Sequence, residues 1–144
     1  MSTLHPGLLI KVCWFDDDMI ELAISASNGQ FAGRTSFYAR LDEPGRLAAC
    51  ISGFPRSQSD SREYEFGGTL SGYGGAKIRF SCKDAKGHLL VQVSIYAAPG
   101  DQKDFVQSAV IQINVVPASI DSFVRDLNSM KLKVGEEAML KNET

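Results

Sequence analysis

The segment that decides the fold is residues 77–130, which read KIRFSCKDAKGHLLVQVSIYAAPGDQKDFVQSAVIQINVVPASIDSFVRDLNSM. Apolar residues alternate with polar ones in three stretches and then recur every three or four residues. Alternation indicates strands with one buried face, and the wider spacing indicates a helix. The apolar set of the strands is Ile78, Phe80, Cys82, Leu89, Val91, Val93, Ile95, Ala109, Ile111, Ile113 and Val115, and that of the helix is Ile120, Phe123, Val124, Leu127 and Met130.

Residues 8–55 show a looser version of the same order. Strands are predicted at 8–15, 20–26 and 31–40, with Phe31 on the apolar face of the last. Asn28-Gly29 predicts a type I′ turn before it. A helix is expected between Asp42 and Gly53, and Ser119 is expected to cap the second helix. We therefore predict an α+β fold with about seven antiparallel strands in two groups that pack together, and two amphipathic helices.

The chain is expected to form a single domain over residues 1–144, because this length buries roughly two-thirds of the unfolded surface. Its two halves look loosely similar. The first, residues 8–55, has the order β-β-β-α, and a polar connector at 56–62 follows it. The second, residues 63–132, has the order β-β-β-β-α, and residues 141–144 are expected to fray.

Composition argues against several classes of partner. The net charge is −2, the pI is about 5.6, and the basic residues are scattered, which is not the clustered basic face that nucleic acid requires. No apolar run reaches the roughly 18 residues of a membrane span, and the N-terminus lacks the positive region of a signal peptide. Three widely spaced cysteines suggest buried thiols in a reducing compartment, so a cytoplasmic location is expected.

Residues that resemble catalytic or ligand-binding motifs are better explained by turns and strands. The glycines between Gly67 and Gly75 precede a strand rather than the helix that a phosphate loop requires, so a turn or bulge is favoured. Asp16-Asp17-Asp18 offers oxygen ligands but lacks EF-hand spacing, so a solvated hairpin turn is favoured over a cation site. The histidines, His5 and His88, lie in no nucleophile motif or zinc spacing. We therefore predict a protein that is not an enzyme, with no catalytic residue, metal or cofactor.

Exposed aromatic and acidic residues are candidates for a protein-binding surface. The four tyrosines are expected on polar strand faces or in loops, and tyrosine is enriched where proteins meet. The high strand propensity of tyrosine explains the same positions without a partner. The candidate partner-binding residues are Asp16, Asp17, Asp18, Glu63, Glu65, Tyr64 and Tyr73.

The second half resembles a known family in two elements. One is Lys86-Gly87-His88-Leu89-Leu90-Val91, a turn glycine followed by histidine and an apolar strand. The other is a helix in which Ile120, Phe123 and Leu127 match the pattern Leu/Ile-x-x-Phe-apolar-x-x-Leu. Together they resemble the WapI-type immunity proteins, small cytoplasmic proteins that neutralise the toxic domain of a contact-dependent toxin. The resemblance covers roughly residues 76–130, with a fainter match at 41–54.

The resemblance implies a non-catalytic binding protein that inhibits a protein partner, such as a toxin domain, by occlusion. Two alternatives remain open. One is a small-ligand-binding or enzymatic domain with a pocket between sheet and helices. The other is a homo-oligomeric structural protein that pairs through a sheet edge.

Overall fold

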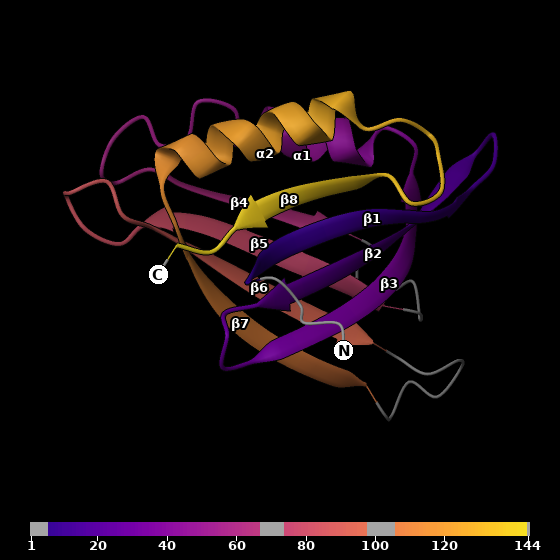
Figure 1. The fold of residues 1–144 in the computed structure, drawn as a ribbon, viewed down its shortest axis with the longest axis horizontal. Helices are drawn as coiled ribbons and strands as arrows, with labels where there is room; N and C mark the ends of the chain where they lie inside the picture. Colours follow the sequence, from indigo (N-terminus) through magenta and orange to yellow (C-terminus); the bar gives the residue numbers. More distant parts are fainter. Residues whose placement is uncertain (1–5, 67–73, 98–105, 144) are drawn as a thin grey trace.

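The computed structural model describes residues 6–66, 74–97 and 106–143, and Figure 1 shows their fold. It is α+β, as predicted. The elements are β1 (Gly7–Phe15), β2 (Met19–Ser27), β3 (Ala32–Arg40), α1 (Glu43–Ile51), β4 (Ser61–Phe66), β5 (Gly74–Cys82), β6 (Leu89–Ala97), β7 (Gln107–Val115), α2 (Pro117–Ser129) and β8 (Glu137–Lys141).

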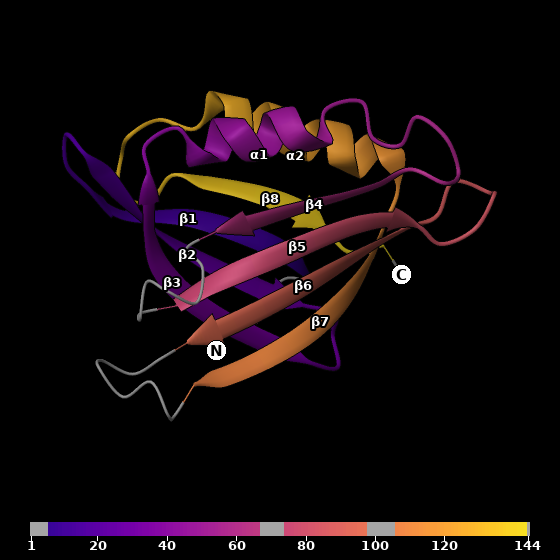
Figure 2. The ribbon, with the colours of Figure 1, turned by 180° about the vertical axis from the view of Figure 1, so that it is seen from behind.

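The strands form two antiparallel sheets that face each other across the core. Sheet A has the order β3-β2-β1-β8, and sheet B has the order β4-β5-β6-β7. The two helices pack on each other along one side of the sheets, where α1 meets β4 and α2 meets β8 (Figures 1 and 2). On the opposite side, β3 crosses sheet B and approaches β5, β6 and β7.

The two halves of the chain exchange a strand. Each half has the order β-β-β-α-β, and in each the strand after the helix leaves its own half. Strand β4 pairs with β5 in sheet B, whereas β8 pairs with β1 in sheet A. The internal similarity seen in the sequence therefore corresponds to a repeated unit, but the second unit begins at β5 rather than at residue 63.

The buried side chains form one cluster between the sheets and helices. It includes the predicted strand residues Ile78, Phe80, Val91, Val93 and Ile113, and the helix residues Ile120, Phe123 and Leu127. Alternating apolar residues therefore face inward, as expected. Ala109 differs, because it lies near the start of β7 where residues 107–110 are exposed.

Strand β8 is the main addition to the predicted fold. It contains only five residues, and its apolar pattern is too short to stand out in the sequence. The tail at 141–144 was expected to fray, whereas residues 141–143 are hydrogen-bonded to the rest of the fold. Lys141 belongs to β8, Asn142 donates a backbone hydrogen bond to Pro6 O, and Glu143 donates one to Asn114 O. Thr144 lies outside the described residues.

Three local expectations were wrong. The β2–β3 turn has positive φ only at Gly29, so it is not type I′, which requires positive φ at both central residues. Phe31 lies in this turn, before β3 begins, and is 68% exposed. Ser119 does not cap α2, because Pro117 already starts the helix and Val116 holds the capping position without a side-chain bond. Proline is favoured at a first helical position, where its missing N–H would have no partner.

Glycines allow the sheets to approach each other. A Cβ at Gly74 would lie 2.7 Å from Ser36 O on β3, and one at Gly33 would lie 2.7 Å from Ile95 Cδ1 on β6. Gly74 and Gly75 lie in β5 rather than in the glycine-rich turn predicted for 67–75, and residues 67–73 lie outside the described residues.

Candidate functional site

A β-bulge in β1 turns Trp14 outward. Val12 pairs with Leu22, both facing the core, but the register then shifts and Trp14 pairs with Glu21. Regular alternation would have placed Trp14 on the same face as Val12, whereas its side chain is 43% exposed. A bulge turns a side chain toward the opposite face of the sheet, and bulges are frequent next to functional sites. The bulge therefore presents a tryptophan on the outer face of sheet A.

Tyr38 packs against Trp14, and Met19 is exposed at the start of β2. Glu21 pairs with Tyr38 on β3, so Trp14, Glu21 and Tyr38 form one row across the sheet. The rings of Trp14 and Tyr38 meet edge to face, with centroids 6.1 Å apart, and Tyr38 is 46% exposed. Met19 is also exposed, and it lines an open hollow of about 320 Å³ together with Tyr38, Arg40 and other residues.

The loop between α2 and β8 brings two more exposed apolar residues to this end of the molecule. Gly135 N donates to Val12 O, and Val12 N donates to Glu136 O, both at 2.9 Å, so the loop is tied to β1 just before the bulge. Leu132 and Val134 are exposed in this loop. Both ribbon views place the loop and the β1–β2 turn at the same end (Figures 1 and 2). We call the exposed residues at this end of the molecule the hairpin-end surface: Trp14, Met19 and Tyr38 of sheet A, with Leu132 and Val134 of the loop, where Leu132 also lines a cavity beside Val12 and Ile20.

The acidic turn predicted from the sequence borders the hairpin-end surface. Asp16, Asp17 and Asp18 connect β1 to β2 and are all exposed. The Asp16 carboxylate accepts hydrogen bonds from the backbone N–H groups of Asp18, at 2.8 Å, and Met19, at 2.9 Å. Asp16 therefore shapes the turn, whereas the carboxylates of Asp17 and Asp18 form no hydrogen bond or ion pair with the described residues.

Glu63 and Glu65 do not add to this acidic turn. They lie on β4 in sheet B, where Glu63 pairs with Arg79 and Glu65 with Lys77 across the β4–β5 ladder. Lys77 Nζ also lies 3.1 Å from Glu63 Oε1. Opposite charges on neighbouring strands offset each other, so this part of sheet B has mixed rather than acidic charge.

Tyr64 occupies the other face of β4 and is half-buried. Its ring packs edge to face on Phe66, with centroids 4.8 Å apart, and its hydroxyl donates to Glu43 Oε1 on α1. Burial, and secondarily this hydrogen bond, raise the pKa of the Tyr64 hydroxyl above its ordinary value. The expectation that Tyr64 lies on a polar face was therefore wrong: the residue joins β4 to α1. Tyr73 lies outside the described residues.

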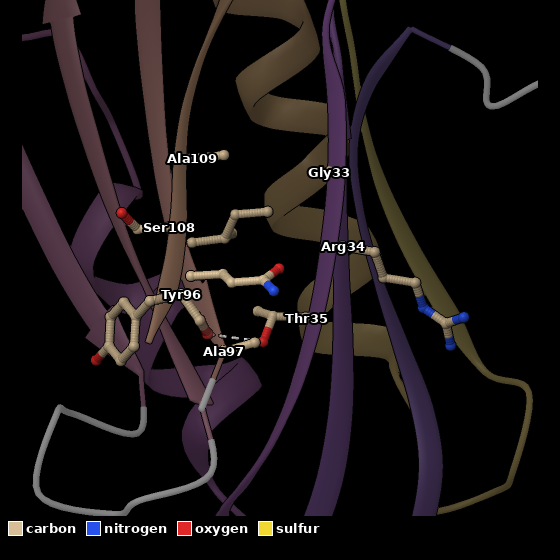
Figure 3. Close-up of a pocket in the computed structure, with 9 residues that line it drawn as sticks. Gly33, Arg34, Thr35, Tyr96, Ala97, Ser108 and Ala109 are labelled. Carbon is tan, nitrogen blue, oxygen red and sulfur yellow. Dashed lines mark hydrogen bonds between the residues drawn. The ribbon is translucent and has the colours of Figure 1, made fainter. Parts of the chain in front are cut away.

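The cavity in Figure 3 lies between β3 and the adjoining ends of β6 and β7. It has a volume of about 170 Å³ and is lined by residues 33–35, 95–97 and 107–109. Thr35 Oγ1 donates to Tyr96 O at 2.8 Å, which joins the two sheets. The side chains of Arg34 and Tyr96 point away from the cavity (Figure 3). Its remaining lining is uncharged, so the lining holds no histidine or carboxylate that could activate the hydroxyl groups of Thr35 and Ser108.

The densest group of titratable side chains surrounds a second cavity, of about 230 Å³, near the start of α2. His88 Nδ1 lies 2.6 Å from Asp84 Oδ2, and Lys83 Nζ donates to Asn114 Oδ1 at 3.2 Å. The bond from His88 is the main cause that lowers the pKa of Asp84 below its ordinary value. Glu143 completes the charged lining. The lining contains no serine or cysteine, so this histidine has no nucleophile to activate there.

A third cavity tests the alternative of a ligand pocket between sheet and helices. It lies between Val12 and Ile20 of sheet A, the start of α1 and the end of α2, and measures about 250 Å³. Small-molecule pockets usually have about 300–1,000 Å³. This cavity is therefore smaller than a typical small-molecule pocket. Among the described residues, no group of acidic, histidine and cysteine side chains has the arrangement of a metal site.

The residues that carry the family resemblance have structural roles. Gly87 has φ +89° in the β5–β6 turn, and Ile120, Phe123 and Leu127 are buried. No protein-family model, curated protein or solved structure matches the chain. Neither helix of the described chain is long and apolar enough to cross a membrane.

Proposed function

We propose that this protein is a non-catalytic binding protein that inhibits a protein partner by occluding the active site of that partner, as immunity proteins do. The main support is the hairpin-end surface, where a bulge exposes Trp14 beside Tyr38 and Met19. Tryptophan, tyrosine and methionine are enriched in interface cores, and a few aromatic residues commonly carry most of the binding free energy.

Acidic and basic residues on different sides of this surface favour one orientation of the partner. Asp17 and Asp18 lie in the β1–β2 turn, whereas Lys131 and Lys133 are exposed in the α2–β8 loop. A complementary partner presents basic residues toward the turn and an apolar hollow toward Trp14. Basic residues line the substrate groove of a nuclease, so a toxin nuclease domain has suitable chemistry. Steering by such charges raises the association rate more than it slows dissociation.

The test is a co-expression rescue assay against the toxic domain of any toxin encoded next to the gene of this protein, with the dissociation constant measured for the purified pair. Trp14→Ala should weaken binding roughly thirtyfold or more and abolish protection, because loss of an interface anchor costs about 2 kcal/mol or more. Phe31→Ala is the matched control, since Phe31 is an exposed aromatic outside this surface. It should leave both binding and protection unchanged.

A second pair of variants separates the charge effect from the apolar contact. A double variant, Asp17→Lys with Asp18→Lys, should associate more slowly with the partner, and this decrease should grow as the salt concentration is lowered. Asp16 is kept, because its carboxylate shapes the turn. Asp121→Lys, an exposed site near the start of α2, is the control. If the wild-type protein gives no protection, the inhibitory function is wrong. Protection by a folded Trp14→Ala variant at the wild-type level would instead exclude this surface.

A further inference from the structure

Strand β7 is an edge strand with none of the usual protection against pairing. It is the outermost strand of sheet B, and its sequence QSAVIQINV contains no charged residue and no proline. Natural edge strands commonly carry lysine, proline or a bulge, because their unpaired backbone groups otherwise recruit another strand. Val110 is 59% exposed on this strand, and Val106 just before it is also exposed.

Helices cover two of the other three sheet edges, and the third edge strand, β3, lies against sheet B. The edge at β8 packs against α2, and the edge at β4 packs against α1. Strand β3 crosses sheet B so closely that a Cβ at Gly74 would lie 2.7 Å from Ser36 O. Strand β7 is therefore the edge at which a further strand can be added.

Among the described residues, hydrogen bonds cap the C-terminal part of this edge. Asn114 N donates to Asn142 Oδ1 at 3.0 Å, and Asn114 O accepts from Glu143 N. Gln112 O accepts from Asn28 Nδ2 at 3.1 Å. Backbone groups of successive strand residues point alternately to the two sides, so those of Val110 and Ser108 face the same outer side as Asn114. Within the described chain, the outward backbone groups of Ser108 and Val110 form no hydrogen bond.

We propose that β7 pairs antiparallel with β7 of a second copy of this chain, around a two-fold axis at Ala109. In this register Ser108 of one copy faces Val110 of the other, so the open N–H and C=O groups of both satisfy each other. The contact cannot extend far, because Asn28 already occupies Gln112 O. Pairing is therefore confined to the uncapped part of the strand.

The side chains favour a second copy over an unrelated peptide. A two-fold axis brings identical residues near each other, and the uncharged β7 does so without like-charge repulsion. In the same register Val106 lies opposite Gln112 of the other copy, where Asn28 anchors the turn that contains Phe31. Both Val106 and Phe31 are exposed in one copy, so each copy supplies both partners of this apolar contact.

The experiment is sedimentation equilibrium of the full chain across a wide concentration range. The wild type should show a reversible monomer–dimer equilibrium, and Val110→Lys and Val110→Glu should each raise the dissociation constant about tenfold or more. An equimolar mixture of the two variants should regain association, because the opposite charges are then diagonal neighbours across the axis, within reach of each other. Circular dichroism checks that each variant is folded.

Val134→Lys is the matched control. Val134 is 61% exposed, close to the exposure of Val110, but lies at the hairpin-end surface. It should dimerise like the wild type. A wild type that stays monomeric at millimolar concentration overturns the proposal, as does unchanged dimerisation of folded Val110→Lys. Loss of dimerisation in Val134→Lys alone would place the contact at the hairpin-end surface and also overturn it. Dimerisation is measured independently of the proposed inhibitory function, which is tested by protection in the co-expression assay.

Discussion

Single residues control how closely the two sheets approach. Gly74 faces the backbone oxygen of Ser36, whereas Gly33 faces the terminal methyl of Ile95, and the space around Gly45 on α1 is open. These three glycines have ordinary φ values, so the effect of an added methyl group depends on its neighbours.

We expect Gly74→Ala to destabilise the fold by about 1–3 kcal/mol, because the backbone of β3 must move. Gly33→Ala should cost less, since the end of the Ile95 side chain can rotate. Gly45→Ala should stabilise the protein by about 0.5–1 kcal/mol, because alanine favours the helix. Urea denaturation of the three variants measures their free energies of unfolding. A Gly74→Ala protein as stable as the wild type would contradict the close approach of the sheets.

At the scale of elements, both helices are held by contacts that the sequence pattern shows only in part. The last carbonyls of α1 are bound by a side chain from the next strand, since Arg62 donates to Cys50 O at 3.1 Å and Ser52 O at 2.8 Å. Arg62 is itself held by Asp60 at 2.9 Å, and its bond lowers the pKa of that carboxyl. The packing of helix α2 rests mainly on its buried residues Ile120, Phe123 and Leu127.

The buried face of α2 can be tested by truncation. Phe123→Ala should destabilise the protein by about 3–5 kcal/mol and Leu127→Ala by about 2–5 kcal/mol, because both side chains are buried in the core. Ser122→Ala, on the exposed side, should change stability by less than about 0.5 kcal/mol. Thermal and chemical denaturation measure the change in the stability of each variant. Similar losses in all three variants would mean that the helix face is misassigned.

At the scale of the whole molecule, the exchange of β4 and β8 makes each half depend on the other. Sheet A receives β8 from the second half, and sheet B receives β4 from the first. A half that lacks its exchanged strand leaves an uncovered sheet edge and loses part of the shared core.

Fragment complementation tests this dependence. We expect fragments 1–70 and 71–144 to be unfolded or aggregated when expressed separately, and to form a folded one-to-one complex when expressed together. Size-exclusion chromatography and circular dichroism measure association and folding. Omitting β8 by ending the second fragment at residue 134 should prevent assembly. A fragment that unfolds cooperatively as an isolated monomer would contradict the proposed dependence.

Local patterns accounted for most of the elements but for less of the candidate surface. Alternation identified the inward faces of β5 and β6, and the helical spacing identified Ile120, Phe123 and Leu127. The strand predicted over 8–15 carried no assignment for Trp14, and strict alternation would not have found its exposed position, because the register shifts between Val12 and Trp14. Leu132 and Val134 were missed because their position beside β1 depends on hydrogen bonds formed across the fold.

The α+β class, the two amphipathic helices and the inward faces of most strands could be predicted from the amino-acid sequence, because these follow from the periodicity of neighbouring residues. Only the tertiary structure decided which strands form the sheet edges, that β8 completes sheet A, and that Glu63 and Glu65 face Arg79 and Lys77. These features arise from pairing between residues far apart in the chain. Such pairing is selected by the total burial and hydrogen bonding of the whole fold, which no local pattern records.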